Sequence, residues 1–139
     1  MRFLLDNNLP PALARALNEL TVREWENAHA VIALRDKFPP NLPDTEWIER
    51  LVNEDRDGWV VVTHDQFNKG IEREVLRRAG LRVFLLDRSW KDHNFWEKAV
   101  QLLRWWPRII EQAEGIRGGA SFRVRWNFSG KGQFEQVNL

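Results

Sequence analysis

The chain has 139 residues, of which 43% are hydrophobic and 29% are charged, close to the averages of globular proteins. This composition excludes a disordered, collagen-like or coiled-coil chain, and the length favours a single domain over residues 1–139. The lack of cysteine excludes disulfide scaffolds, thiol catalysis and cysteine-based zinc sites. No apolar run approaches the roughly 20 residues that cross a bilayer, so we expect a soluble, cytoplasmic protein with no membrane partner.

The net charge of +1 hides an uneven distribution along the chain. Residues 1–65 hold 12 acidic and 7 basic residues, whereas residues 66–139 hold 8 acidic and 14 basic residues. This polarity is typical of a protein in which an acidic metal-binding centre lies beside a basic surface that meets phosphates. Ordinary solvated faces give the same counts, so charge alone leaves both interpretations open.

Apolar runs alternate with helical patterns along the chain. Three consecutive valines in residues 59–63 give the strongest strand pattern, because β-branched residues favour a pleated surface buried on both faces. We expect Asn8 to cap the first helix, and Pro107 to open a new helix. Residues 21–28 fit either a helix extension or a loop. Strands are expected at 2–6, 30–34, 59–63, 81–86 and 122–126, and helices at 9–20, 44–52, 70–79, 92–106 and after 107.

This alternation predicts an α/β fold of three layers, α/β/α, with a mainly parallel central sheet. Residues 111–139 are expected to form a C-terminal strand and hairpin extension, with a turn at 129–132. Eight tryptophans are many for this length, and most fit core positions. Trp90 and Trp105 break the apolar pattern, so either core packing or an exposed aromatic surface is open for them.

Three acidic residues, Asp6, Asp65 and Asp87, follow closely on apolar strands. Parallel strands bring their carboxyl ends to one edge of the sheet, where open α/β sheets place their ligand sites. Asp44 lies at the start of its helix, on the face that its apolar residues occupy, and is expected to join them. Clustered carboxylates repel one another unless a cation neutralises them. We therefore expect Asp6, Asp44, Asp65 and Asp87 to hold Mg²⁺ or Mn²⁺.

Such a centre predicts metal-assisted hydrolysis of a phosphodiester, because the ion activates a bound water and stabilises charge in the transition state. We expect Asp6, Asp44 and Asp65 to be catalytic, with the Thr63 hydroxyl orienting Asp65 or the water. Each residue also has a structural interpretation. Asp44 suits a helix N-cap, Asp6 and Asp65 suit the start of turns, Asp87 suits a solvated loop, and Thr63 suits a bond to main-chain groups.

Substrate contacts are expected beside these carboxylates. His64 lies inside the predicted site, although a neutral loop histidine is the alternative interpretation, and Asn7 follows the first acid. Lys37, in the loop after the second strand, is expected to reach the same crevice. Among the basic residues that follow the acidic core, Lys69 and Arg73 are expected to contact phosphates, although helix-surface Lys and Arg are commonly only solubilising.

Seven segments of the chain resemble successive landmarks of PIN-like domains, and the subgroup they resemble most is that of VapC-type toxins. The resemblance covers about the first 110 residues, and the joint pattern is far more specific than any one piece. The segments are FLLDNNLP (3–10), LRDKFP (34–39), PDTEWI (43–48), GWVVVTHD (58–65), AGLRVFL (79–85), FWE (95–97) and WPRI (106–109).

The resemblance implies a Mg²⁺- or Mn²⁺-dependent endoribonuclease, the toxin of a type II toxin–antitoxin pair. Its partners would be RNA, a small antitoxin protein and a second copy of the chain as a homodimer. The family acids map onto Asp6, Asp44 and Asp65, the last with Thr63. His64 departs from the Arg, Lys or Asn of many relatives, and the fourth family acid has only a positional match.

Two other functions fit the residues. One is a catalytically weak PIN-like domain that only binds a partner. The other is a receiver-like signalling domain, which also gathers acids around Mg²⁺ and uses one Asp as a phosphate acceptor. A receiver predicts a Lys after a later strand, paired with a hydroxyl residue on an earlier one, whereas Asp87-Arg88-Ser89 follows the fourth strand here.

Overall fold

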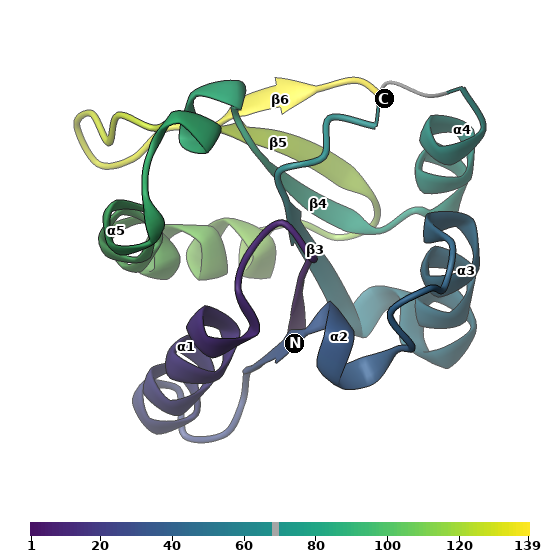
Figure 1. The fold of residues 1–139 in the computed structure, drawn as a ribbon, viewed down its shortest axis with the longest axis horizontal. Helices are drawn as coiled ribbons and strands as arrows, with labels where there is room; N and C mark the ends of the chain where they lie inside the picture. The colour runs from purple at the N-terminus through teal and green to yellow at the C-terminus, as the bar shows by residue number, and fades with distance from the viewer. Residues whose placement is uncertain (68–69) are drawn as a thin grey trace.

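The computed structural model describes residues 1–67 and 70–139, and a six-stranded sheet runs through its middle (Figure 1). The strand order is β2-β1-β3-β4-β5-β6, with every pair parallel except β5 and β6. The predicted α/β fold with a mainly parallel sheet is confirmed. The strands are β1 (Arg2–Leu5), β2 (Ala30–Ala33), β3 (Trp59–Thr63), β4 (Arg82–Leu86), β5 (Ala120–Val124) and β6 (Glu135–Val137).

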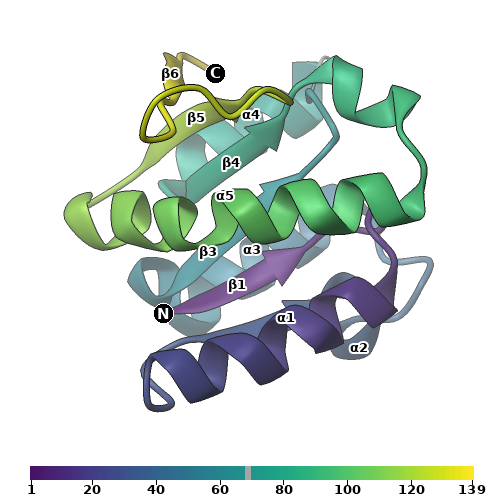
Figure 2. The same ribbon diagram turned by 90° about the vertical axis from the view of Figure 1, so that its left-hand side faces the viewer.

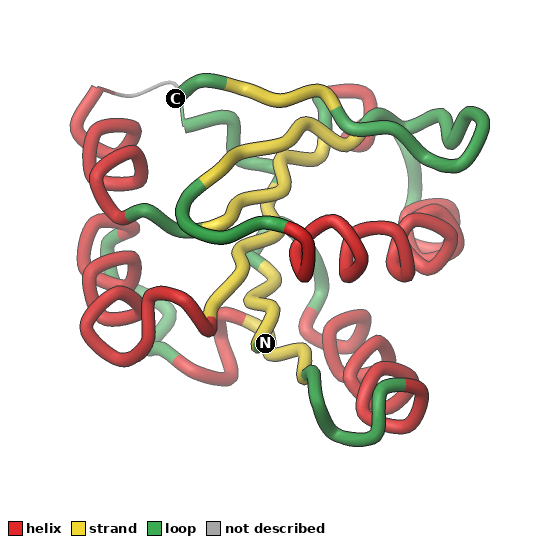
Figure 3. Tube along the Cα trace, turned by 180° about the vertical axis from the view of Figure 1, so that it is seen from behind, coloured by secondary structure: helices red, strands yellow, loops and turns green. Residues whose placement is uncertain are grey.

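Helices cover both faces of the sheet and make the predicted three layers. Helices α1 and α5 lie on one face, and α3 and α4 on the other, as Figures 1 and 2 show and Figure 3 repeats from behind. The helices are α1 (Pro11–Glu24), α2 (Leu34–Lys37), α3 (Asp44–Asp55), α4 (Gly70–Ala79) and α5 (Phe95–Gly115), with short 3-10 turns η1 (Arg56–Gly58) and η2 (Arg88–Asp92).

Strand β3 shows why the sheet is covered twice. Its five residues are all buried, Val60 and Val62 in the core under α1 and α5, and Val61 in the core under α3 and α4. Side chains alternate between faces along a strand, so a run of valines supplies both cores at once.

Several boundaries differ from the sequence-based expectation. Pro10, not Asn8, is the N-cap of α1, with Pro11 in the first helical position, where its missing N–H costs nothing. Residues 95–115 form one helix that contains Pro107, not two helices. Pro107 and Leu103 both lie on the exposed side of α5, where the carbonyl freed by the missing N–H is able to bind water. Strand β5 ends at Val124, two residues earlier than expected.

The interpretation of Trp90 and Trp105 as exposed aromatics is wrong. Both are buried, and the Trp90 Nε1–H donates to the Val124 carbonyl at 3.0 Å. Trp96, on α5, is the exposed one, with 75% of its surface accessible. Among the described residues, no helix is both long and apolar enough to pass through a bilayer.

The strand order reverses at β1, which places β2 on one side of it and β3 on the other. Open α/β sheets bind ligands outside the carboxyl ends of the strands at such a switch point. Asp6 comes directly after β1, and Asp65 comes two residues after the end of β3. The topology therefore brings both carboxylates to the crevice that the strand order creates.

Candidate metal centre

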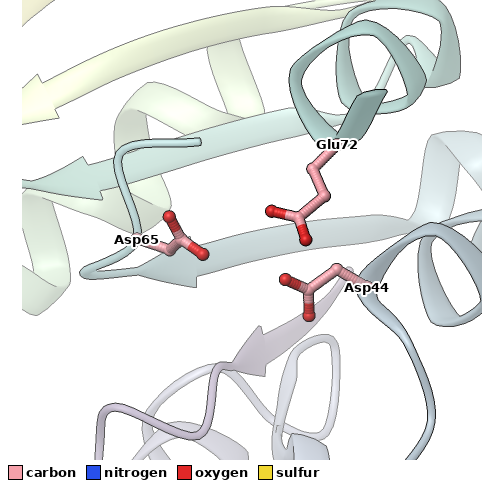
Figure 4. Close-up of side chains that lie close together, drawn as sticks. All are labelled: Asp44, Asp65 and Glu72. Atoms are coloured by element: carbon pink, nitrogen blue, oxygen red, sulfur yellow. The ribbon is translucent and has the colours of Figure 1, made fainter. Parts of the chain in front are cut away.

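Three carboxylates meet at the carboxyl edge of the sheet, those of Asp44, Asp65 and Glu72 (Figure 4). One oxygen from each lies within 4.8 Å of the other two, and all three residues are partly buried. They come from three separate elements: the start of α3, the loop after β3 and the first turn of α4. Only the tertiary fold brings them together.

Helix N-termini position two of the three. Helix α3 begins at Asp44 and α4 begins at Gly70, so Asp44 and Glu72 both lie in a first turn, where the helix dipole favours negative charge. The Asp44 Oδ1 also accepts a 2.8 Å hydrogen bond from the Trp47 indole. The interpretation of Asp44 as an N-cap is wrong, because Pro43 occupies that position and makes no side-chain cap.

A tight turn holds the third. The Asp65 Oδ1 accepts the Phe67 main-chain N–H at 2.8 Å, and the Asp65 N–H donates to the Thr63 Oγ1 at 2.9 Å. Phe67 has a φ of 48° in the left-handed region and a fully buried side chain, so packing holds this turn in place. Asp65 thus both starts a turn and faces the other carboxylates.

Asp6 lies beside this group and shares Thr63 with it. The Thr63 hydroxyl donates to the Asp6 Oδ2 at 2.7 Å, and the Asn7 N–H donates to the Asp6 Oδ1 at 2.6 Å. Burial raises the pKa of the Asp6 carboxyl above its ordinary value, and the charges of Asp44 and Asp65 raise it further, while the two hydrogen bonds oppose the rise. A bound cation would offset the cost of burying the charged Asp6 carboxylate and the repulsion from Asp44 and Asp65.

The donor set fits a hard divalent cation. Carboxylate oxygens are preferred ligands of Mg²⁺ and Mn²⁺, and Mg²⁺ keeps several waters when few carboxylates are available. Ligand oxygens about 2.1 Å from an octahedral ion lie at most about 4.2 Å apart. Separations within 4.8 Å therefore need only small side-chain rotations to bring Asp44, Asp65 and Glu72 onto one ion.

A family model described as "PIN like domain" matches residues 1–88 of the chain. The chain belongs to the PIN-like domain family. Neither the curated proteins nor the solved structures compared with the chain gave a match. PIN-like domains are typically nucleases that use a divalent metal, and the matched range contains Asp6, Asp44, Asp65 and Glu72. The VapC-type subgroup stays a prediction.

Glu72 was not predicted from the sequence, and Asp87 was expected in its place. In this PIN-like domain the Asp87 carboxylate accepts bonds from the main-chain N–H and hydroxyl of Ser89 and caps η2, outside the carboxylate group. The structure thus supports the interpretation of Asp87 as a loop residue. Glu72, like Asp44, is an acid in the first turn of a helix, but the sequence does not show that the starts of these two helices meet.

His64 and Lys37 do not reach the carboxylates. His64 comes directly after β3, and its ring approaches Trp90, a residue of the core under α1 and α5, with centroids 6.5 Å apart. Lys37 Nζ lies 2.8 Å from the Glu54 carboxylate and 4.9 Å from the centroid of the Trp59 ring. Trp59 begins β3, so Lys37 lies near the amino end of the sheet, away from the predicted crevice.

The other predicted substrate contacts lie in varied settings. Asn7 is exposed directly beside Asp6. Arg73, which follows Glu72 in the chain, lines a cavity and donates to the Asn138 carbonyl at 3.0 Å. Lys69 lies outside the described residues. The roles of these residues in substrate binding stay predictions.

Proposed function

We propose that this PIN-like protein is an endoribonuclease that hydrolyses RNA phosphodiesters with Mg²⁺ or Mn²⁺. The observation that carries the proposal is the convergence of Asp44, Asp65 and Glu72 on one spot beside the switch point of the sheet. Carboxylates this close together repel one another unless a cation lies among them. Family membership supports nuclease chemistry at this spot.

Each residue then has a distinct role. Asp44, Asp65 and Glu72 would bind the ion through one oxygen each, with Asp6 completing the ligand set. The bound ion supplies an activated water and stabilises negative charge on the phosphodiester. Thr63 is a positioning residue, because its hydroxyl ties Asp6 to the main chain of Asp65 and so fixes the ends of β1 and β3 relative to each other.

Metal binding tests the centre directly. Titration with Mn²⁺ should give saturable binding and a higher melting temperature, because a ligand that binds only the folded state stabilises it by about 2.7 kcal/mol at 100 times its Kd. Asp44→Asn and Asp65→Asn should abolish most of this stabilisation. Glu46→Gln, an exposed acid in the same first turn as Asp44, is the matched control and should behave as wild type.

Cleavage of single-stranded and structured RNA in the presence of Mn²⁺ tests the activity. Hydrolysis should stop on addition of EDTA and fall by orders of magnitude in Asp65→Asn, whereas Glu46→Gln should retain it. Cleavage that persists unchanged in Asp65→Asn would contradict the proposal. Metal binding without cleavage of any RNA would favour the alternative of a catalytically weak PIN-like binding module.

The finer proposal is the toxin of a type II toxin–antitoxin pair, acting on cytoplasmic RNA. Helix α5 exposes Trp96, Val100 and Leu103 at the spacing of one helix face. An exposed apolar stripe of this kind is typical of protein contacts and supports a small antitoxin protein as partner. Co-purification with the product of a neighbouring small open reading frame should be lost in Trp96→Ser. Light scattering of the chain alone would reveal a homodimer instead.

A receiver-like domain is the second candidate, because receivers share the strand order 2-1-3-4-5 seen here in β1 to β5. The residues favour the nuclease. Strand β5 is followed by Arg125, which pairs with Glu135 at 3.2 Å, in place of the Lys that a receiver requires. Incubation with acetyl phosphate and Mg²⁺ should therefore leave Asp65 unmodified, and a phosphoryl adduct on Asp65 would support the receiver instead.

A further inference from the structure

A cavity of about 470 Å³ includes in its lining the chain neighbours of two residues of the proposed metal centre. Its lining includes Arg73, Arg88 and Arg123, together with Gln66 and Asp87. Gln66 follows Asp65 directly in the chain, and Arg73 follows Glu72. The loop after β3 and helix α4, two of the elements that build the centre, therefore also contribute to the cavity.

The cavity carries an excess of positive charge. Among its side chains, three guanidinium groups line it against one carboxylate, that of Asp87, which is already bonded to Ser89. Arg123 lies 3.2 Å from the Glu135 carboxylate, a half-exposed ion pair that an incoming anion can displace. Arg88 is exposed and has neither a hydrogen bond nor an ion pair from its side chain within residues 1–67 and 70–139.

The walls of the cavity are fixed by bonds to the main chain. The Gln66 amide donates to the carbonyls of His64 at 2.9 Å and Leu86 at 2.8 Å, which ties the loop after β3 to the end of β4. The Arg73 guanidinium donates to the Asn138 carbonyl at 3.0 Å, which ties α4 to the segment after β6. These bonds fix the loop after β3 and the guanidinium of Arg73, so that part of the pocket needs little ordering on binding.

A second cavity lined by arginines provides a contrast. It measures about 250 Å³ and lies at the other end of the sheet, with Arg56, Arg82 and Arg117 in its lining. Arg82 is buried and donates to the carbonyls of Ala113 at 2.8 Å and Asp57. Its guanidinium is therefore occupied by structural bonds. The cavity of Arg73, Arg88 and Arg123 differs because Arg88 is free of such bonds within the described part of the chain.

We infer that the cavity of Arg73, Arg88 and Arg123 binds the backbone phosphate next to the scissile phosphate of a single-stranded RNA. The inference rests on the proposed ribonuclease function. An RNA strand with one phosphodiester at the carboxylates must continue along the surface on either side of them. The cavity offers guanidinium groups there, each able to form two parallel hydrogen bonds to phosphate oxygens. The cavity would set the direction in which the strand crosses the metal centre.

The test measures RNA binding and metal binding separately. A fluorescein-labelled single-stranded RNA oligonucleotide is titrated in EDTA against wild type, Arg88→Gln and Arg123→Gln. Each substitution should weaken binding by about tenfold, because it removes a charge-assisted bond. The double variant should also show a shallower dependence of log K on log salt, by roughly 0.7 for one lost phosphate contact. Arg77→Gln, on the exposed side of α4, is the control and should bind as wild type.

Two further arms separate the outcomes. Mn²⁺ binding should be unchanged in the arginine variants, which shows that they are folded and that the centre is intact. Oligonucleotides with and without a 5′-phosphate should lose the same factor, since the cavity binds a backbone phosphate. A loss confined to the 5′-phosphorylated RNA would overturn the inference in favour of a terminal phosphate.

Failure of the inference differs from failure of the proposed function. Wild-type RNA affinity in the arginine variants, with cleavage still dependent on Asp65, overturns the cavity and leaves the nuclease standing. A wild-type protein that neither binds nor cleaves any RNA overturns the function, and the cavity with it.

Discussion

The Thr63 hydroxyl donates to the Asp6 Oδ2 at 2.7 Å and joins the ends of β1 and β3. The same oxygen accepts the Asp65 N–H, so one buried hydroxyl positions two acids. Thr63→Val keeps the shape but removes both bonds and leaves the Asp65 N–H without its acceptor. We expect the free energy of unfolding to fall by about 1–3 kcal/mol, measured by urea denaturation.

If the role of Thr63 were only structural, Thr63→Val would lower the free energy of unfolding and leave Mn²⁺ affinity unchanged. As a positioning residue it should also weaken Mn²⁺ binding when replaced by Val, whereas Thr63→Ser, which retains the hydroxyl, should restore both stability and metal affinity. Mn²⁺ affinity in Thr63→Val equal to that of wild type would contradict the positioning role.

Burial of His64 predicts a dependence of stability on pH. Burial, with smaller contributions from the charges of Lys98 and Lys91, lowers the pKa of His64 to about 4. The unfolded chain, with an ordinary pKa near 6.5, binds this proton more readily than the folded one, so folding should lose about 3 kcal/mol as the pH falls from about 6.5 to about 4. The variant His64→Phe lacks a titratable group at this position, so it should not show this loss of stability.

Urea denaturation across this pH range checks the prediction. Carboxylates also titrate there, so the informative quantity is the difference in unfolding free energy between wild type and His64→Phe. That difference should grow in favour of the variant as the pH falls. A difference that is constant with pH would show that His64 is not held neutral by the fold.

Close packing of two glycines gives a prediction about the sheet. A Cβ on Gly119 would lie 2.8 Å from the Cα of Gly80, a main-chain contact that cannot yield by rotating a side chain. Gly119→Ala should therefore lower the free energy of unfolding by roughly 1–3 kcal/mol. Gly115→Ala, at the end of α5 with open space around it, should instead raise it by about 0.5–1 kcal/mol. Thermal melts of the two variants in opposite directions would confirm the difference.

The strands, and the two acids that follow β1 and β3, were predictable because local patterns determine them. Apolar runs that end near Asp6 and Asp65 mark the carboxyl ends of parallel strands. Those ends lie at the same edge of the sheet, however the helices pack on its faces. The placement of His64 was also available in the sequence. Strand alternation puts it opposite Thr63, and this periodicity outweighs its nearness in sequence to Asp65.

Tertiary packing decides the rest. Glu72 belongs to the centre only because α4 packs beside α3, and no periodicity in either helix encodes that approach. Lys37 leaves the crevice because α2 is a single turn that returns the chain toward Glu54 and Trp59. The length of the loop after a strand determines neither the position of Glu72 nor that of Lys37, so both positions are known only from the structure.

The choice between Glu72 and Asp87 as the fourth acid gives the last prediction. Glu72 faces Asp44 and Asp65, whereas Asp87 uses its carboxylate to cap η2. Glu72→Gln replaces a charged ligand by a neutral amide of the same size, and should weaken Mn²⁺ binding by more than about tenfold, judged against the 10–100-fold losses measured for outer-shell partners. Asp87→Asn leaves the proposed ligands untouched and should bind Mn²⁺ as wild type does. Calorimetric titration of both variants, with the half-exposed Glu74→Gln as a control on α4, decides the matter. Equal losses in Glu72→Gln and Asp87→Asn would mean that the metal centre extends toward β4 and would contradict the assignment of Glu72 alone.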